Sequence, residues 1–166
     1  MRAFGSVLAL GLLGLPPLGA EPAASAVLLH VTGEVKTKLE LKAEDLARMP
    51  RRTVEAKDHD GKPTKFEGVV LADVLASAGV PFGSVLRGEN LARFLLATAA
   101  DGYRVVFALP ELDPEFTDDV VLLADRRDGQ PLPEREGPLR LVVPHEKRQA
   151  RWIRQLTTLT VLTAAP

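Results

Sequence analysis

The sequence is divided into short apolar runs by Asp-Gly pairs, and this division limits what the chain can fold into. Three such pairs occur, at Asp60-Gly61, Asp101-Gly102 and Asp128-Gly129. An Asp-Gly pair between apolar segments is a strong signal for a tight turn that joins two antiparallel strands. The pattern therefore predicts a chain dominated by short strands that pair mostly in antiparallel hairpins.

Between these turns the apolar residues follow two periods. Residues 35–41 alternate between apolar and polar side chains, as a half-buried strand does. Residues 70–78 place apolar side chains on one helical face, and Gly79 and Pro81 stand where a helix would end. The predicted strands are residues 27–31, 35–41, 52–57, 64–66, 94–99, 103–109, 120–124, 130–133, 139–143 and 156–162, and the predicted helices are 43–49 and 70–78, with a single helical turn in 110–116. These segments predict a β-rich, mixed α+β domain with short helices.

The N-terminal residues have the composition of an export signal. Arg2 is followed by an apolar run over residues 7–15 and by small residues up to Ala20. This order is typical of a secretory signal peptide. We therefore expect a signal peptide over 1–20, with cleavage possible as late as residue 26, a single domain over 27–163, and a periplasmic location. An N-terminal anchor that is never cleaved is the alternative, although the run is shorter than the roughly 20 apolar residues of a membrane-spanning helix.

The composition removes several function classes. The chain has 166 residues and no cysteine, so packing alone, without disulfides, must stabilise an exported domain. The formal net charge is −1, with acidic and basic residues interspersed, which does not indicate a nucleic-acid partner. The sequence also lacks the Gly-x-Ser-x-Gly, Ser-x-x-Lys, His-Glu-x-x-His and glycine-rich phosphate-loop motifs. We therefore predict no catalytic residue.

Four segments in order carry a family resemblance. They are Val31-Thr32-Gly33-Glu34-Val35, Phe66-Glu67-Gly68-Val69, Ala100-Asp101-Gly102-Tyr103, and Gly137-Pro138-Leu139-Arg140 leading to Pro144. Together they resemble the sulfite-oxidase-fold, molybdopterin-binding domain of oxidoreductases over nearly the whole of residues 27–163. The resemblance implies that fold for this chain.

The same resemblance shows one departure. Enzymes of this family ligate molybdenum through a cysteine in the segment that corresponds to residues 52–60, where Thr53 and Asp58 are the closest counterparts. Neither is a thiolate, so the oxidase activity is not carried over. The chain is similar instead to small periplasmic members, some of which bind reduced pterins without metal and serve as sensory subunits of membrane signalling proteins. The resemblance thus implies a pterin-type ligand, ahead of molybdopterin, and a membrane signalling partner with a periplasmic domain.

The stretch from Pro144 to Arg154 is the richest in candidate ligand-binding residues. Arginine offers a rigid fork of donors for carboxylate, phosphate or ring carbonyls, which makes Arg148 and Arg151 candidates. Trp152 offers a stacking face, and His145 lies in the same predicted loop. The alternatives are that the cations form a solvated rim and that Trp152 is a core anchor.

A second group of candidates lies at the predicted hairpins. Asp58 and His59 stand at a turn close to the position of the family's cysteine, where they could contact a pterin. Turn carboxylates more often shape the turn itself, and a metal site needs three or four converging ligands, so we predict no metal there. Tyr103 begins a strand and matches the family segment, but its neighbour Arg104 must point to the opposite face.

Three functions remain open from the sequence. The first is a non-catalytic periplasmic protein that binds a pterin-type ligand and reports occupancy to a membrane partner. The second is a molybdenum-cofactor oxidoreductase with altered metal ligation. The third is an interaction domain that binds no small ligand.

Overall fold

The computed structural model describes residues 26–165, so the predicted signal peptide lies outside the described residues. This range contains ten strands, two α-helices and four short 3-10 helices. The β-rich α+β composition predicted from the sequence is confirmed. No helix in the described range is long and apolar enough to cross a membrane.

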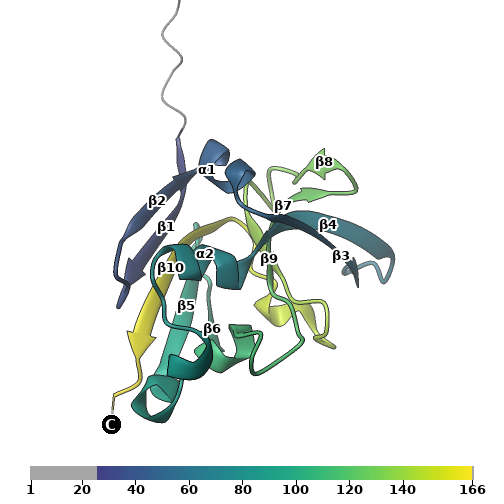
Figure 1. Cartoon of the computed structure of the whole chain (residues 1–166). Helices are drawn as coiled ribbons and strands as arrows, with labels where there is room; N and C mark the ends of the chain where they lie inside the picture. The colour runs from purple at the N-terminus through teal and green to yellow at the C-terminus, as the bar shows by residue number, and fades with distance from the viewer. Residues whose placement is uncertain (1–25, 166) are drawn as a thin grey trace, which may run out of the picture.

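The first sheet joins both ends of the described chain to one hairpin from its middle (Figure 1). Its members are β1 (Val27–Gly33), β2 (Leu39–Lys42), β5 (Arg93–Ala99), β6 (Arg104–Ala108) and β10 (Leu156–Thr163). Their order across the sheet is β2-β1-β10-β5-β6. The β1–β10 pair is parallel, and the other neighbours are antiparallel, as the hairpin signals indicate.

The second sheet carries the hairpin that matters most for the candidate site. Its members are β3 (Arg51–Lys57), β4 (Pro63–Val70), β7 (Leu122–Arg127), β8 (Gln130–Pro131) and β9 (Arg140–Val142). β3 pairs with β4, β4 pairs with β7, and the far side of β7 is shared by β8 and β9. β3 is therefore an outer edge of this sheet.

The helices are short and lie in the segments that connect the strands. The α-helices are α1 (Ala43–Arg48) and α2 (Leu71–Ser77), and the 3-10 helices are η1 (Gly83–Val85), η2 (Gly88–Ala92), η3 (Leu109–Leu112) and η4 (Gln149–Arg151). Gly79 ends α2 as predicted, with a φ of 78° that glycine adopts without strain. Its N–H donates to the Ala76 carbonyl at 2.9 Å, which satisfies a carbonyl that the helix leaves free.

All three Asp-Gly pairs lie between paired strands. They separate β3 from β4, β5 from β6, and β7 from β8. Each turn glycine has a positive φ, between 75° and 85°. The hairpin predictions are therefore confirmed.

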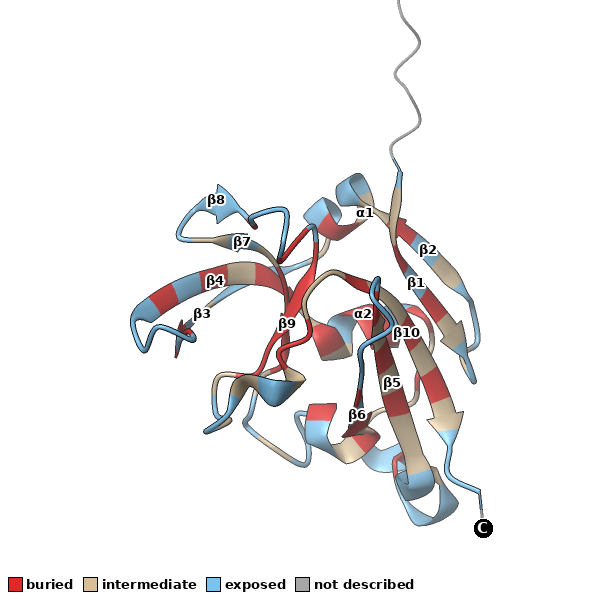
Figure 2. Cartoon of the chain, turned by 180° about the vertical axis from the view of Figure 1, so that it is seen from behind, coloured by how far each residue is buried: buried red, intermediate tan, exposed pale blue. Residues whose placement is uncertain are grey.

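The two sheets and α2 enclose one hydrophobic core (Figure 2). In β5 the buried residues alternate, at Leu95, Ala97 and Ala99, so only one face of this strand meets the core. In β9 all three residues are buried, which places that strand inside the molecule. Arg140, the first residue of β9, is thus held in an apolar environment.

Gly68 explains why β4 and β7 can lie so close together. A β-carbon at this position would stand 1.9 Å from the Leu123 carbonyl oxygen. The register between the two strands shifts at the same place, between Glu67 and Gly68. A side chain there would separate the strands, so the Phe66-Glu67-Gly68 segment requires glycine for close backbone approach.

Most predicted strands differ from the structure by a few residues at their ends, and two of them begin at least two residues later than predicted. The strand predicted over 35–41 is paired only from Leu39, because the Thr37 N–H donates to Ala78 after α2 instead of to a neighbouring strand. The strand predicted over 120–124 begins at Leu122, since the Val121 carbonyl accepts the N–H of Leu71 at the start of α2. Both differences arise from hydrogen bonds to residues at the ends of α2. Such contacts join segments that are distant in the chain, so a local sequence pattern cannot predict them.

Candidate functional site

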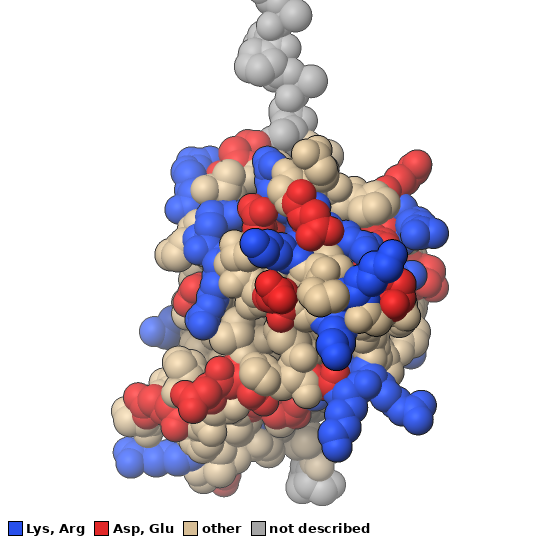
Figure 3. All heavy atoms as spheres, turned by 90° about the vertical axis from the view of Figure 1, so that its right-hand side faces the viewer, with Lys and Arg blue, Asp and Glu red and all other residues tan. Residues whose placement is uncertain are grey.

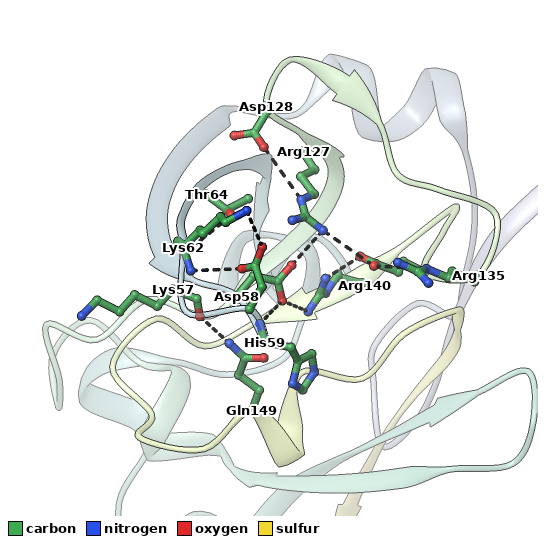
Figure 4. A network of polar contacts seen from close by, with 12 residues as sticks. Lys57, Asp58, His59, Lys62, Thr64, Arg127, Asp128, Arg135, Arg140 and Gln149 are labelled. Carbon is green, nitrogen blue, oxygen red and sulfur yellow. Dashed lines mark hydrogen bonds and ion pairs between the residues drawn. The ribbon is translucent and has the colours of Figure 1, made fainter.

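A surface pocket of about 920 Å³ lies between the β3–β4 hairpin and the loop that follows β9. Segments 55–63 and 144–150 line it, and we call it the hairpin pocket. Lys57 and Gln149 meet where the two segments approach each other (Figure 4). Its volume is within the range of about 300–1,000 Å³ that small-molecule sites occupy.

Asp58 turns inward from the hairpin and forms part of the pocket wall. It is 6% exposed, and both of its carboxylate oxygens are occupied (Figure 4). Oδ1 accepts the His59 backbone N–H at 2.8 Å and the Arg140 guanidinium at 3.4 Å. Oδ2 lies 2.9 Å from Nη1 of Arg127. Asp58 therefore ties the hairpin to β7 and β9 and has no oxygen free for a ligand.

Arg140 is the centre of this network and has no exposed surface. Its Nη1 donates to Oε2 of buried Glu136 at 2.6 Å. Its Cζ lies 5.1 Å from the ring centroid of Phe66 and 5.4 Å from that of Trp152, so the cation rests on two aromatic faces. Two arginines and two carboxylates, Arg127 and Arg140 with Asp58 and Glu136, balance one another in a buried network behind the pocket wall. We call this network the floor; Asp58 is its one member that lines the pocket.

The ionisation of Asp58 follows from these contacts. Burial by itself raises the pKa of its carboxyl group, because removal from water disfavours the charge. The hydrogen bond from the His59 N–H and the positive charges of Arg140 and Arg127 act in the opposite direction and together prevail. The net result is a pKa below the usual value, so Asp58 is a carboxylate at neutral pH.

The rim of the hairpin pocket is basic and, unlike the floor, unpaired. Lys57, Lys147 and Arg148 are exposed and line the pocket. Among the described residues none of these three cations forms an ion pair with a carboxylate. Figure 3 shows the side of the molecule on which the hairpin lies in Figure 1, where basic side chains stand among acidic ones. The three rim cations are therefore available to an anionic or carbonyl-bearing ligand.

Gln149 joins the two walls of the pocket. Its Nε2 donates a hydrogen bond to the backbone carbonyl of Lys57. Its Oε1 is buried and accepts no hydrogen bond within the described part of the chain. An acceptor without a partner at the edge of a pocket is a place where a ligand N–H would be favourable.

Three of the seven predicted ligand-binding residues meet at the hairpin pocket: Asp58, His59 and Arg148. Two others, Tyr103 and Trp152, line a smaller pocket of about 370 Å³ beside η4. The Tyr103 hydroxyl donates to the Ala150 carbonyl at 2.8 Å. Trp152 is 4% exposed, and its Nε1 donates to the Val143 carbonyl at 3.0 Å. Its position is that of a core anchor, the alternative that the sequence left open.

The last two predicted residues, Arg151 and His145, line a third and smaller pocket. Arg151 lies 2.8 Å from Glu111 and 2.5 Å from Glu146, and its Cζ lies 4.5 Å from the Phe107 ring centroid. Burial lowers the pKa of its guanidinium, but the bonds to both carboxylates outweigh this and raise it. Arg151 is thus engaged within the fold.

The exposed imidazole of His145 faces Asp119, with its Nε2 3.5 Å from Oδ1. It lies outside the lining of the hairpin pocket, although the sequence places it only three residues before Arg148. His145 and Arg148 therefore line different pockets, although they lie in the same loop.

Residues 19–165 match the model of the oxidoreductase molybdopterin binding domain. The chain belongs to this family. No curated protein matches it.

Among solved structures, the crystal structure of the sulfane dehydrogenase SoxCD from Paracoccus pantotrophus is similar to the structure of this chain. The TM-score is 0.63, and the sequences are 25% identical. The match covers 80% of this chain and 37% of that chain, so the present domain spans little more than a third of the enzyme's length. The sulfite-oxidase-like fold implied by the four sequence segments is thereby confirmed.

The donor groups of this family member do not fit a molybdenum centre that is ligated by the protein. The chain has no thiolate to offer. Thr53 is exposed on β3 and lies outside the pocket lining, and Asp58 is already bound by two guanidinium groups. The described residues contain no cluster of three or more His, Asp or Glu side chains that could hold a metal ion. We therefore assign no chemical step to a metal.

Sequence reasoning missed the two residues that organise this pocket, Arg140 and Gln149. Arg140 interrupts an otherwise apolar run, Leu139 to Val143, and a charge in such a run is a signal of a buried ion pair. Gln149 lies in the basic stretch that the sequence singled out, but nothing local distinguishes its carboxamide. Its role depends on the approach of Lys57, which is 92 positions away.

Proposed function

We propose that this domain is a non-catalytic binding protein for a pterin-type ligand, which occupies the hairpin pocket. The observation that carries the proposal is the contrast between the floor, a network of mutually paired charges behind the pocket wall, and the rim of unpaired cations that line the pocket. Such a site can hold a ligand by fixed polar groups, and the chain offers no thiolate to ligate the molybdenum on which the family's enzymes depend. Binding is therefore favoured over catalysis.

The rim matches the chemistry of a pterin. The ring system is flat, carries a carbonyl oxygen and several N–H groups, and bears polar or anionic substituents. The Arg148 guanidinium offers a fork of donors to the carbonyl or to an anionic substituent, and Lys57 and Lys147 add positive charge. The Oε1 of Gln149 offers an acceptor to a ring N–H.

The floor fixes the position of these groups. Asp58 is a positioning residue, because its carboxylate holds the hairpin against Arg127 and Arg140 instead of facing the ligand. A hairpin held in this way loses little conformational entropy when a ligand binds, which favours affinity.

The alternative function is a molybdenum-cofactor oxidoreductase with altered metal ligation. Membership of the family favours it, but the donor set of this chain does not. Elemental analysis of protein produced in a molybdate-replete host distinguishes the two functions. Stoichiometric molybdenum in the purified protein would support the oxidoreductase and contradict the binding protein.

The proposal extends to the cellular context predicted from the sequence. The N-terminal pattern supports export to the periplasm, where the domain would report ligand occupancy to a membrane signalling protein. Fractionation of cells that produce the full chain tests the location. Retention of the protein in the cytoplasm would remove this part of the proposal.

Isothermal titration with tetrahydrobiopterin tests ligand binding directly. We expect saturable binding to the native protein and a loss of about tenfold in affinity for Arg148→Ala, because one charge-assisted contact is removed. Arg104→Ala is the matched control, since Arg104 is also exposed but lies on β6, outside the pocket lining. Absence of saturation across a panel of reduced pterins, or equal losses in both variants, would contradict the proposal.

A further inference from the structure

The β3 strand offers an open edge along the hairpin pocket. It is seven residues long and pairs on one side only, with β4. The other sheet edges in residues 26–165 are shorter: β2 has four residues, β8 has two, β9 has three and β6 has five. In β6 the Val106 carbonyl already accepts a hydrogen bond from Arg151. A long unpaired edge is a template for the addition of another strand.

The register shows which backbone groups point outward from this edge. The Asp58 N–H donates to the Lys62 carbonyl at 3.1 Å, which makes these two residues a hydrogen-bonded pair of the ladder. In an antiparallel ladder such pairs alternate, so Ala56 and Val54 also direct their groups toward β4. Lys57, Glu55 and Thr53 therefore direct their N–H and C=O groups away from the sheet.

The contact made by Gln149 confirms this direction. Its Nε2 donates to the Lys57 carbonyl from outside the sheet, in the way that an N–H group of an added strand would. The outward groups of Glu55 and Thr53 have no such partner within the described chain. The edge is thus closed at Lys57 and open at the two preceding outward positions.

The pocket lies along this edge and not over one face of the sheet. Glu55 and Ala56 both line it, although neighbouring strand residues point to opposite faces. The loop with Lys147 and Arg148 forms the opposite wall. A segment of extended chain beside β3 would therefore lie between the strand and the basic loop.

The charges around the edge indicate the chemistry of the segment. Lys57, Lys147 and Arg148 line the groove without carboxylate partners, whereas Glu55 is its one exposed carboxylate. Asp58 and Glu146, the other acids in the lining, are already paired with arginines. We propose that the β3 edge binds an extended acidic segment of a partner protein, which adds as a strand beside Thr53 and Glu55 and ends at Lys57, where Gln149 closes the edge.

This inference rests on the proposed function in one respect. Because the added strand and the pterin would share the hairpin pocket, binding of one excludes the other. Ligand occupancy would then be reported to the partner by release of its acidic segment.

Fluorescence anisotropy with a labelled peptide tests the docking surface. The probe is a fluorescein-labelled peptide of alternating threonine and glutamate, about ten residues long. We expect it to bind the native protein at least about tenfold more tightly than the threonine–glutamine peptide does. N-methylation of alternate peptide amides removes the backbone donors without altering the protein, and we expect it to abolish binding.

Two variants at Glu55 distinguish the contribution of its backbone N–H to peptide binding from that of its side chain. Glu55→Pro deletes an outward N–H and leaves the β3–β4 ladder intact, as proline is tolerated on an edge strand. Glu55→Thr keeps the N–H and removes the same carboxylate, so it is the matched control. We expect the proline variant to lose at least about tenfold in affinity and the threonine variant to bind at least as tightly as the native protein.

The two proposals fail in distinguishable ways. Binding of tetrahydrobiopterin without any anisotropy change up to about 1 mM peptide would overturn the docking surface and leave the pterin site standing. Equal binding of the N-methylated peptide would also overturn it. Peptide binding that tetrahydrobiopterin saturation does not reverse would overturn mutual exclusion. A concentration-dependent dimer that Glu55→Pro dissociates would show that a second copy of the chain uses this edge, and would overturn the acidic partner.

Discussion

The floor and the rim of the hairpin pocket use the same kinds of side chain for opposite purposes. In the floor, Arg140 is fully buried, two carboxylates neutralise it, and two aromatic rings contact it. At the rim, Arg148 is exposed and has no ion pair with any described residue. A buried cation without partners would be very unfavourable, whereas an exposed one is solvated. Charge in the floor therefore supports the fold, and charge at the rim is left for a ligand or partner.

The largest expected effect tests the floor. Arg140→Met keeps an unbranched apolar stem but removes the guanidinium group, which leaves Asp58 and Glu136 buried with a reduced counter-charge. We expect the free energy of unfolding to fall by about 3–5 kcal/mol, measured by urea denaturation. A loss below about 1 kcal/mol would show that the network contributes no more than a surface ion pair.

Acid unfolding tests the same network through Asp58. The pKa of this carboxyl group is lowered in the folded protein. Folding therefore stabilises the ionised form relative to the unfolded chain. Its contribution is complete above the unfolded pKa of about 3.9 and is lost as the pH falls through the folded value. In urea titrations, the stability difference between the native protein and Asp58→Asn should be constant from about pH 5 to 7 and should shrink below about pH 4. A difference that does not change with pH would contradict the assignment.

Arg151 provides an intermediate case between floor and rim. Its guanidinium is paired with Glu111 and Glu146 and lies over Phe107, but a third of the side chain is exposed. We expect Arg151→Ala to reduce the free energy of unfolding by about 1 kcal/mol, which is less than the loss at Arg140, because water screens the pairs. Pterin affinity should stay within about twofold of the native value in the same preparation. A tenfold loss of affinity would place Arg151 in the binding site.

The smallest expected effect on stability is that of Arg148→Ala. Since this arginine has no ion pair in the described structure, the free energy of unfolding should change by less than about 0.5 kcal/mol. Thermal and urea denaturation measure this, and the titration described above measures binding. Loss of stability comparable to that of Arg151→Ala would mean that the rim supports the fold and would remove the contrast with the floor.

The stretch from Pro144 to Arg154 shows how far sequence reasoning could reach at the site. The residue types predicted a basic loop between two strands, and the structure places such a loop between β9 and β10. They could not show that Arg148 lines the hairpin pocket while Arg151, three residues later, binds Glu111. The reason is that Glu111 comes from η3, 40 positions earlier in the chain, and only packing brings it to Arg151.

The sequence by itself determined the three hairpins, the dominance of short strands and the absence of a thiolate. These features depend on local backbone preferences of Asp-Gly turns, on period-two burial, and on composition. Only the tertiary structure decided that β1 pairs in parallel with the last strand, that β3 remains an open edge, and which arginines are neutralised. Those outcomes depend on residues that are distant in the chain, such as Asp58 and Arg140, separated by 82 positions. Charge compensation inside a protein acts between neighbours in space, and a sequence pattern records only neighbours along the chain.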